Sequence, residues 1–320
     1  MSDIDWRWLT QNPEYESGGN AAQLTVNDGP DALVRESVQN SSDAALDDMT
    51  PRIVFSFIEL TGQHRADFLN ALRWPAVRGH LEAMRDATGA TLGRAIGPGL
   101  EAIDAGGPLR LLRIADYGCH GLTGREFGPT QAGEQANFVN LCRRDLFSEK
   151  DEGKGGSWGL GKSVYWHFSS ISMALFHSVP SQRCVEAQGR RSRLFGVVHG
   201  SAHALGGERY LGRAYLGVQS DGEHVSVWDD HDAAVALRLT REDDSPGTSI
   251  LVVGFHDPSG GETDVGELIS SVQSSFRRSF WPAMARETAE FMVEYIEDDK
   301  LPESHSLDAT DTYPELSLAT

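Results

Sequence analysis

Three polar side chains near the start of the chain have the types and the spacing to handle a metal ion and water. They are Glu36, Asn40 and Asp43. In a helix, which turns by about 100° per residue, they would fall within about 60° of one another, whereas Val34 and Val38 would point the other way. The pattern predicts a helix with one dry face and one face suited to chemistry. An amphipathic surface helix whose acids are only solvated would show the same stripe.

The residues before this stretch carry the signals of a helix start. Turn formers occupy residues 27–29. Pro30 suits a first helical turn, and Asp31 places an acid near the helix N-terminus. A helix is therefore expected to begin near Pro30 and to carry the polar stripe.

A second candidate site lies where an apolar run, 109–115, stops at Asp116 and is followed by Gly118 and Gly121. Such a run is typical of a strand. A carboxylate at a strand end can accept a hydrogen bond from a ligand amine, while neighbouring glycines let that ligand approach closely. A simple turn after a strand has the same composition.

A glycine-rich segment, 155–163, follows, and its backbone N–H groups could surround an anion. Residues 156–163 also fit G-x-x-x-x-G-K-S, the phosphate loop of another class of nucleotide-binding protein. That loop requires a hydrophobic strand directly before it, whereas residues 148–154 are charged and make a poor central strand. The phosphate loop is therefore disfavoured.

The fourth segment is Gly247-Thr248, which leads into a strand-like run, 249–253. Its threonine could bridge to a buried acid. A plain turn before a strand would look the same.

In this order the four segments resemble the GHKL ATPases, the superfamily of gyrase, the large heat-shock chaperone, histidine kinases and the mismatch-repair protein MutL. Residues 36–44 resemble the N box, in a form close to the chaperone version. Residues 116–118 resemble the adenine-binding motif, 156–161 the glycine-rich lid, and 247–248 the final Gly-Thr. The resemblance covers about residues 20–255.

The resemblance implies how the N box would act. Asn40 would coordinate the magnesium ion that bridges the phosphates, because a hard cation suits an oxygen ligand. Glu36 would orient and deprotonate the attacking water. Asp43 would support the same site or only complete the polar stripe. The implied cofactors are ATP and Mg²⁺.

The resemblance also implies how the base and the phosphates would be held. Asp116 would accept a hydrogen bond from the adenine amino group, with help from Thr248, and Gly118 would let the base approach. Backbone amides of the lid would close over the phosphates. The binding residues implied in the lid are Gly156, Gly159, Gly161 and Lys162. A residue added to the Asp116 motif leaves the role of Gly121 open, and Lys162 could equally be a solvated lysine.

Glu36 separates the branches of the superfamily. Histidine kinases resemble this pattern but usually carry asparagine at that position, and no acceptor-histidine helix precedes the N box, since the first histidine is His64. The chain therefore resembles the hydrolases of the gyrase, chaperone and MutL branch. The expected activity is slow ATP hydrolysis to ADP and phosphate, in which lid closure drives dimerisation or partner engagement. The alternative is a module that binds nucleotide as a sensing ligand without turnover.

The charge balance bears on the partners. With 28 basic against 47 acidic residues, direct nucleic-acid binding by this chain alone is disfavoured, because such a surface repels nucleic acid unless basic residues cluster. Short basic clusters occur at 190–193 and 277–278. The expected partner is a second copy of the chain or another protein, and Trp6 and Trp8 are candidates for that surface or for a local core. A role in bacterial defence or DNA transactions is an expectation by association.

The expected location is the cytoplasm. Cys119, Cys142 and Cys184 are widely spaced without metal-type pairing, which fits a reducing compartment. No apolar run reaches membrane-spanning length, and the first residues lack the basic and apolar regions of a signal peptide. His199 and His203 are four apart, but their surroundings favour a strand end over a zinc site.

The expected fold class is α+β: a Bergerat-type α/β sandwich in which a mixed, mostly antiparallel sheet is covered by helices on one face and carries a mobile lid. The expected domains are an ATP-binding domain, 1–260, with a helical insertion at about 62–100 and the lid at about 122–162; a C-terminal helical segment, 261–300, with one helix over about 265–298; and an acidic flexible tail, 301–320.

Overall fold

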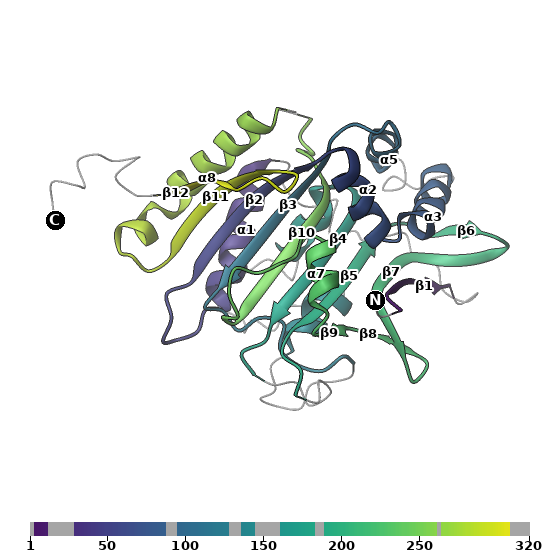
Figure 1. Ribbon diagram of the computed structural model, residues 1–320, viewed down its shortest axis with the longest axis horizontal. Helices are drawn as coiled ribbons and strands as arrows, with labels where there is room; N and C mark the ends of the chain where they lie inside the picture. Colours follow the sequence, from purple (N-terminus) through teal and green to yellow (C-terminus); the bar gives the residue numbers. More distant parts are fainter. Residues whose placement is uncertain are drawn as a thin grey trace.

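The computed structural model of the chain describes residues 3–11, 29–87, 95–127, 136–144, 161–182, 189–260 and 264–307. Their strands form a sheet in the order β1-β7-β5-β4-β10-β3-β2-β11-β12 (Figure 1). The bounds are β1 (Asp5–Thr10), β7 (Glu208–Ser220), β5 (Arg193–His199), β4 (Ser169–Val179), β10 (Gly247–Phe255), β3 (Leu109–Tyr117), β2 (Arg52–Leu60), β11 (Glu290–Glu297) and β12 (Glu303–Leu307). Short strands β6 (His203–Leu205) and β8 (Glu223–Val225) pair with β7, and β9 (Val227–Trp228) pairs with β5.

The pairing along this path is antiparallel except between β2 and β11, which run parallel. The central strand β10 is buried along its whole length, as expected for a strand covered on both faces. In its register, Ser249 lies opposite Ala115 of β3 and His177 of β4. The start of β10 therefore lies beside the end of β3, where Asp116 stands.

One face of the sheet carries α1 (Pro30–Asp43), α6 (Val164–His167) and α8 (Val265–Ala285). Val34 and Val38 of α1 and Phe276 of α8 belong to the same buried cluster as the sheet residues Phe55 and Ile114. Figure 1 shows α1 and α8 along the side of the sheet formed by β2, β3 and β11. This layer confirms the predicted α+β sandwich with a mostly antiparallel sheet.

The opposite face carries α2 (Gly62–Ala71), α3 (Trp74–Asp86), α5 (Gly97–Asp104) and α7 (His231–Ala236). Phe68, Leu81 and Leu100 of the first three helices pack in a second buried cluster with sheet residues such as Leu251. Three of these helices, α2, α3 and α5, lie in and around the range 62–100, and they form a second helical layer that the sequence analysis did not place.

The C-terminal part differs from its prediction. The helix expected over 265–298 ends at Ala285, and 290–297 forms β11 beside β2. The helix stops where Glu287 takes a left-handed conformation (φ 52°), and the following run, 290–297, is rich in aromatic and β-branched residues, which favour a strand. Glu294 accepts a hydrogen bond from Ser56 of β2 at 2.8 Å. The expected tail from 301 onward also contributes β12 before the described residues end.

The N-terminal strand β1 forms the other edge of the sheet by pairing with β7. Trp6 is buried, and its indole N–H donates to the carbonyl of Leu72 at 2.8 Å. Trp8 stacks on the ring of His80, with centroids 4.1 Å apart. Trp6 therefore fills a local core, which is the second of the two roles considered for it. Among the described helices, none combines the length and the apolar character needed to cross a membrane.

Candidate nucleotide-binding site

Helix α1 presents the polar stripe that the sequence predicts. Leu33, Val34 and Val38 are fully buried against the sheet and α8, whereas Glu36 is partly exposed and Asn40 and Asp43 are exposed. The predicted helix and its two faces are therefore confirmed. Near its start, Asp31 accepts hydrogen bonds from Ser275 and Arg278 of α8, which fixes α1 on that helix.

The Asp116 carboxylate joins three elements at the end of β3. Its Oδ1 accepts a hydrogen bond from the backbone N–H of Thr248 at 2.8 Å, and its Oδ2 accepts one from the Ser41 hydroxyl at 3.0 Å. The Thr248 hydroxyl instead lies 3.1 Å from the hydroxyl of Ser178 on β4. The link between Thr248 and the acid is thus made by the backbone of Thr248.

The environment of Asp116 shifts its pKa in opposing directions. Burial raises the pKa of the carboxyl group, while the Arg241 guanidinium, the Thr248 N–H and the Ser41 hydroxyl lower it, and the net direction is upward. Burial and the nearby Asp116 also raise the pKa of the Cys119 thiol. Cys119 is a buried free cysteine whose Sγ donates to the carbonyl of Ser41 at 3.3 Å. The carboxylate is therefore held in a polar cage inside a low-dielectric setting.

Glycines allow the chain to close around this carboxylate. Gly121 has φ +68°, and a Cβ there would lie 2.7 Å from the carbonyl oxygen of Val179 and 2.8 Å from the Ser178 hydroxyl. Gly247 has φ +153°, and its Cβ would lie 2.2 Å from the Asp116 carbonyl oxygen. Both positions exclude larger residues for packing reasons inside the protein. Gly118 also has a positive φ, +73°, but a Cβ there would come no closer than 3.3 Å to any atom.

The exposed side of α1 contacts α6 at Asn40. The Asn40 Nδ2 donates to the Tyr165 hydroxyl at 3.4 Å, and burial raises the pKa of Tyr165 to about 12, so this hydroxyl stays neutral. Glu36 lies 3.6 Å from the Arg35 guanidinium. Asn40 thus uses its amide nitrogen in this contact, and its amide oxygen is an acceptor that could serve a ligand.

Of the predicted lid residues, Gly156 and Gly159 lie outside the described residues. Gly161 begins a 3-10 turn, η3 (Gly161–Ser163), directly before α6. Lys162 donates to the carbonyl of Asn140 at 2.5 Å and also to that of Arg144. Its ammonium group therefore lies at the end of a short π-helix, η2 (Val139–Arg143), and is directed to protein carbonyls.

Three residues of this site were not assigned from the sequence. Ser41 stands inside the quoted N box, and its position on the buried side of the stripe is the signal that could have identified it. Arg241 and Tyr165 lie in segments without a motif, far along the chain from Asp116 and Asn40. No sequence spacing links such pairs, because the fold alone brings them together.

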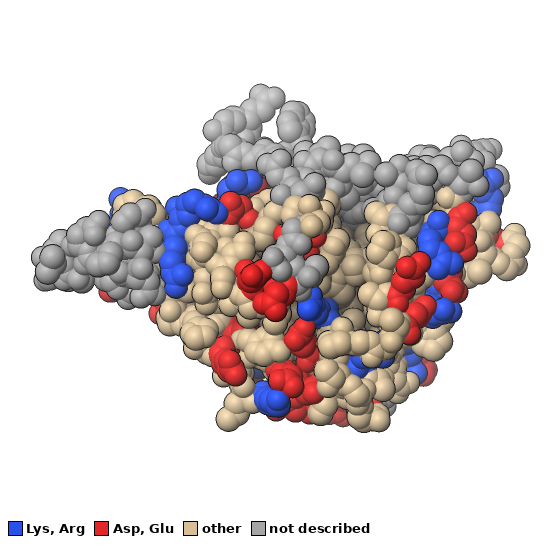
Figure 2. Space-filling model, turned by 90° about the horizontal axis from the view of Figure 1, so that it is seen from above, with Lys and Arg blue, Asp and Glu red and all other residues tan. Residues whose placement is uncertain are grey.

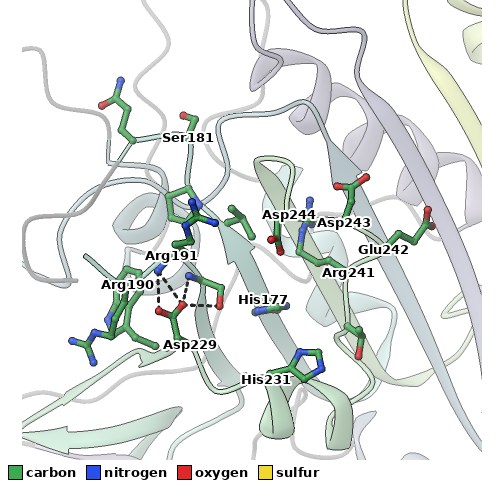
Figure 3. Close-up of a pocket in the computed structure, with 16 residues that line it drawn as sticks. His177, Ser181, Arg190, Arg191, Asp229, His231, Arg241, Glu242, Asp243 and Asp244 are labelled. Atoms are coloured by element: carbon green, nitrogen blue, oxygen red, sulfur yellow. Dashed lines mark hydrogen bonds between the residues drawn. The ribbon is translucent and has the colours of Figure 1, made fainter. Parts of the chain in front are cut away.

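A separate pocket of about 750 Å³ opens on the face of the sheet opposite α1. It is lined by His177 of β4, whose neighbour Ser178 points to the α1 face because successive strand residues alternate between faces. Figure 3 shows Arg241 beside His177 and next to the acidic run Glu242, Asp243 and Asp244. Asp229, across the pocket, accepts hydrogen bonds from the backbone N–H groups of Arg191 and Ser192. Arg241 thus lines this pocket and also reaches the end of β3.

The basic cluster at 190–193 does not form one exposed patch. Arg193 is fully buried, where it donates to Glu126 at 2.5 Å. Figure 2 shows acidic and basic side chains interspersed on the face that it draws.

No protein-family model matches the sequence, and no curated protein matches it. Among solved structures, the chain is similar to the N-terminal domain of a DNA repair protein, with 11% identity and a TM-score of 0.39, over 90% of this chain and 54% of that one. It is also similar to the ATP-binding domain of topoisomerase IV from Francisella tularensis in complex with a small-molecule inhibitor, with 12% identity and a TM-score of 0.37, over 99% of this chain and 59% of that one. The chain thus spans between half and two thirds of the length of each. Similarity at this level does not define a function.

Proposed function

We propose that the chain is an ATP-binding protein of the GHKL type that hydrolyses ATP slowly to ADP and phosphate with magnesium. The hydrogen bond from Ser41 of α1 to Asp116 at the end of β3, 3.0 Å long, carries this proposal. Asn40 directly precedes Ser41 on α1, and Glu36 lies about 7.5 Å from Ser41 along the helix axis. This hydrogen bond therefore places the polar stripe of α1 near the Asp116 carboxylate. A base held at Asp116 would then extend its phosphates along α1.

The base end would recognise an amino group. Each oxygen of an ionised carboxylate has two acceptor positions, and in Asp116 one oxygen accepts from the Thr248 N–H and the other from the Ser41 hydroxyl. Acceptor capacity therefore remains for the amino group of adenine. Gly118, whose positive φ of +73° favours glycine, would border the base.

Magnesium would be held by the amide oxygen of Asn40. The donor type fits, because Mg²⁺ prefers oxygen ligands and usually binds through one or two protein groups together with substrate phosphates. Tyr165 accepts from the Asn40 amide nitrogen and so turns the amide oxygen away from α6. When bound, the ion would neutralise charge that develops on the phosphate oxygens.

Glu36 would act as the base in hydrolysis. Its carboxylate would accept a proton from water while the water oxygen bonds to the γ-phosphorus and the bond from that phosphorus to the β–γ bridging oxygen breaks. ADP keeps the bridging oxygen and its electron pair, and inorganic phosphate leaves. The partial exposure of Glu36 fits this role, because the carboxylate must reach both solvent and the phosphates.

Lid closure would couple the nucleotide to assembly. Lys162, Gly161 and the lid glycines Gly156 and Gly159 would contact the phosphates on closure, and the closed form would engage a second copy of the chain or a partner protein. A ligand shifts such an equilibrium only if it contacts the two forms differently, and the γ-phosphate would supply that difference. The size of the protein measured with and without a non-hydrolysable ATP analogue tests this step.

Phosphate release by purified protein with magnesium and ATP tests the proposal. Wild type should release phosphate, and Glu36→Gln should lower turnover by about a hundredfold or more while it keeps nucleotide affinity, as expected for loss of a general base. Glu101→Gln is the control, since Glu101 is exposed on the opposite helical layer. Equal turnover in wild type and Glu36→Gln would reject Glu36 as the base. Binding without phosphate release by wild type would favour the nucleotide-sensing module.

A further inference from the structure

Arg241 contacts the end of β3 from the face opposite α1. Its guanidinium Nη2 donates to the backbone carbonyl of Asp116 at 2.8 Å and to that of Ser245 at 3.2 Å, and Nη1 donates to the Ser249 hydroxyl at 3.2 Å. The guanidinium carbon lies 4.4 Å from the centre of the Tyr117 ring. Ser249 and Tyr117 alternate along their strands with Thr248 and Asp116, so Arg241 stands behind the carboxylate, across the sheet.

The charge of Arg241 lies close to the Asp116 carboxylate. A Cβ added to Gly247 would be 2.7 Å from Arg241 Nη2 and 2.8 Å from Asp116 Oδ1, so both atoms border the same small space. Arg241 is only 9% exposed, and a buried cation acts strongly on a nearby acid because little water screens it. The same contact fixes the backbone of Asp116, since Nη2 is bonded to its carbonyl.

Among the described residues, the other groups that act on the Asp116 side of the sheet are neutral or acidic. Thr248 and Ser41 donate from a backbone N–H and a hydroxyl, and burial keeps Cys119 and Tyr165 in their neutral forms. Glu36 on α1, which also acts on Tyr165, adds a negative charge on that side. Among the groups that shift the pKa of Asp116, the cation is therefore Arg241, and it opposes the rise that burial causes.

The protonation state of Asp116 decides which base the site can take. An ionised carboxylate only accepts hydrogen bonds and so matches the amino group of adenine, whereas a protonated carboxyl group can donate to the carbonyl oxygen that guanine carries at the same ring position. We propose that Arg241 is a positioning residue that keeps Asp116 charged and in place, and thereby makes the site select adenine over guanine. This inference rests on the proposed adenine site.

The test compares affinities for non-hydrolysable ATP and GTP analogues between pH 5 and pH 8. Wild type should prefer the ATP analogue. Arg241→Met should weaken ATP-analogue binding at pH 7 by about tenfold or more, as expected for a lost charge-assisted contact. The pH at which ATP-analogue affinity is lost on acidification should also rise by about one unit or more. An opposite charge at this range lowers a carboxyl pKa by about 1–3 units, so loss of the cation lets the Asp116 pKa rise. The ratio of the two affinities should fall towards one.

Two further variants separate charge from structure. Arg241→Lys keeps the cation but loses the planar guanidinium whose two nitrogens reach the carbonyls and the Ser249 hydroxyl, so it should retain the pH dependence and the base preference with weaker binding. It also serves if Arg241→Met does not fold. Arg113→Met is the matched control, because Arg113 is a partly buried arginine that donates to the Thr240 carbonyl and to Ser56 without touching Asp116. This control should keep the pH dependence and the base preference of wild type.

The outcomes distinguish this inference from the proposed function. Equal weakening of both analogues at every pH by Arg241→Met, with no shift in the pH at which affinity is lost, would overturn the positioning role and leave ATP binding intact. A pH dependence in Arg241→Lys that matches that of Arg241→Met would also overturn it. If wild type binds neither analogue, the proposed function itself fails.

Discussion

The two ends of the proposed nucleotide site are built differently. At the base end, Asp116 is bonded to α1 and to the start of β10, and Gly121 and Gly247 leave no room for a larger residue. At the phosphate end, Glu36 and Asn40 project from one helix, and within the described residues the Asn40 side chain forms a hydrogen bond with Tyr165. The base end is preorganised by contacts within the protein, whereas the phosphate end would form its contacts only with the bound magnesium ion and phosphates. Selection of the base and turnover of the phosphate can therefore be disturbed separately.

The base end should show the largest effect of a single change. Asp116→Ala should weaken binding of both adenosine and an ATP analogue by about a hundredfold or more, because a partly buried acceptor for the amino group is lost and its donors Ser41 and Thr248 are left unpaired. Calorimetry measures both affinities. Asp43→Ala, an exposed residue of the same stripe, should affect adenosine little. Retained adenosine affinity in Asp116→Ala would show that Asp116 does not bind the base.

The phosphate end should respond only to ligands that carry phosphates. Asn40→Ala should weaken the magnesium complex of an ATP analogue by about tenfold, the cost of one contact to a charged group, and leave adenosine unchanged. Titrations with and without magnesium measure this difference. Gln39→Ala, the neighbouring residue on α1, is the control. If adenosine weakens as much as the analogue, the two ends are not separable.

Protonation of histidines outside the site should change the stability of the free protein with pH, and this effect should be smaller than the effects on ligand binding. His80 Nδ1 lies 2.8 Å from His203 Nε2 under the Trp8 ring, with Tyr210 against both imidazoles. Burial, with His203 adding to it, lowers the pKa of His80 to about 4 from 6.5. A lowered histidine pKa means that stability is present above pH 6.5 and is lost as the pH falls towards 4. The melting temperature of the free protein should drop by a few degrees over this range.

His80→Phe keeps a ring against Trp8 and removes the titrating group. Its melting temperature should change less than that of wild type between pH 6.5 and pH 4. Equal slopes in the two proteins would assign the acid sensitivity to other groups. Tryptophan fluorescence follows the same transition, because Trp8 lies on His80.

The sequence predicted the parts of the site that have a local pattern. The stripe of α1 follows from helical spacing, and Asp116 follows from an apolar run that ends in an acid and glycines. The helical insertion follows in the same way from its composition. In each case the signal is local in the sequence, because neighbouring positions share the same environment.

The parts that were missed depend on contacts between distant segments. Arg241 has no neighbour in the sequence that marks it, and its role comes from β10 pairing with β3. The sequence analysis extends the helix through 290–297, although the aromatic and β-branched residues of this run favour a strand once the helix end at Ala285 is known. Its parallel pairing with β2 joins residues from opposite ends of the chain, which no local pattern specifies.

Competition between adenosine and an ATP analogue tests most directly whether Asp116 and Asn40 hold one molecule. A non-hydrolysable ATP analogue is titrated with magnesium into wild type, first alone and then in the presence of saturating adenosine. A single shared pocket predicts one analogue per chain and a loss of apparent affinity that grows with the adenosine concentration. Analogue binding with unchanged affinity in saturating adenosine, or no analogue binding at all, would contradict it.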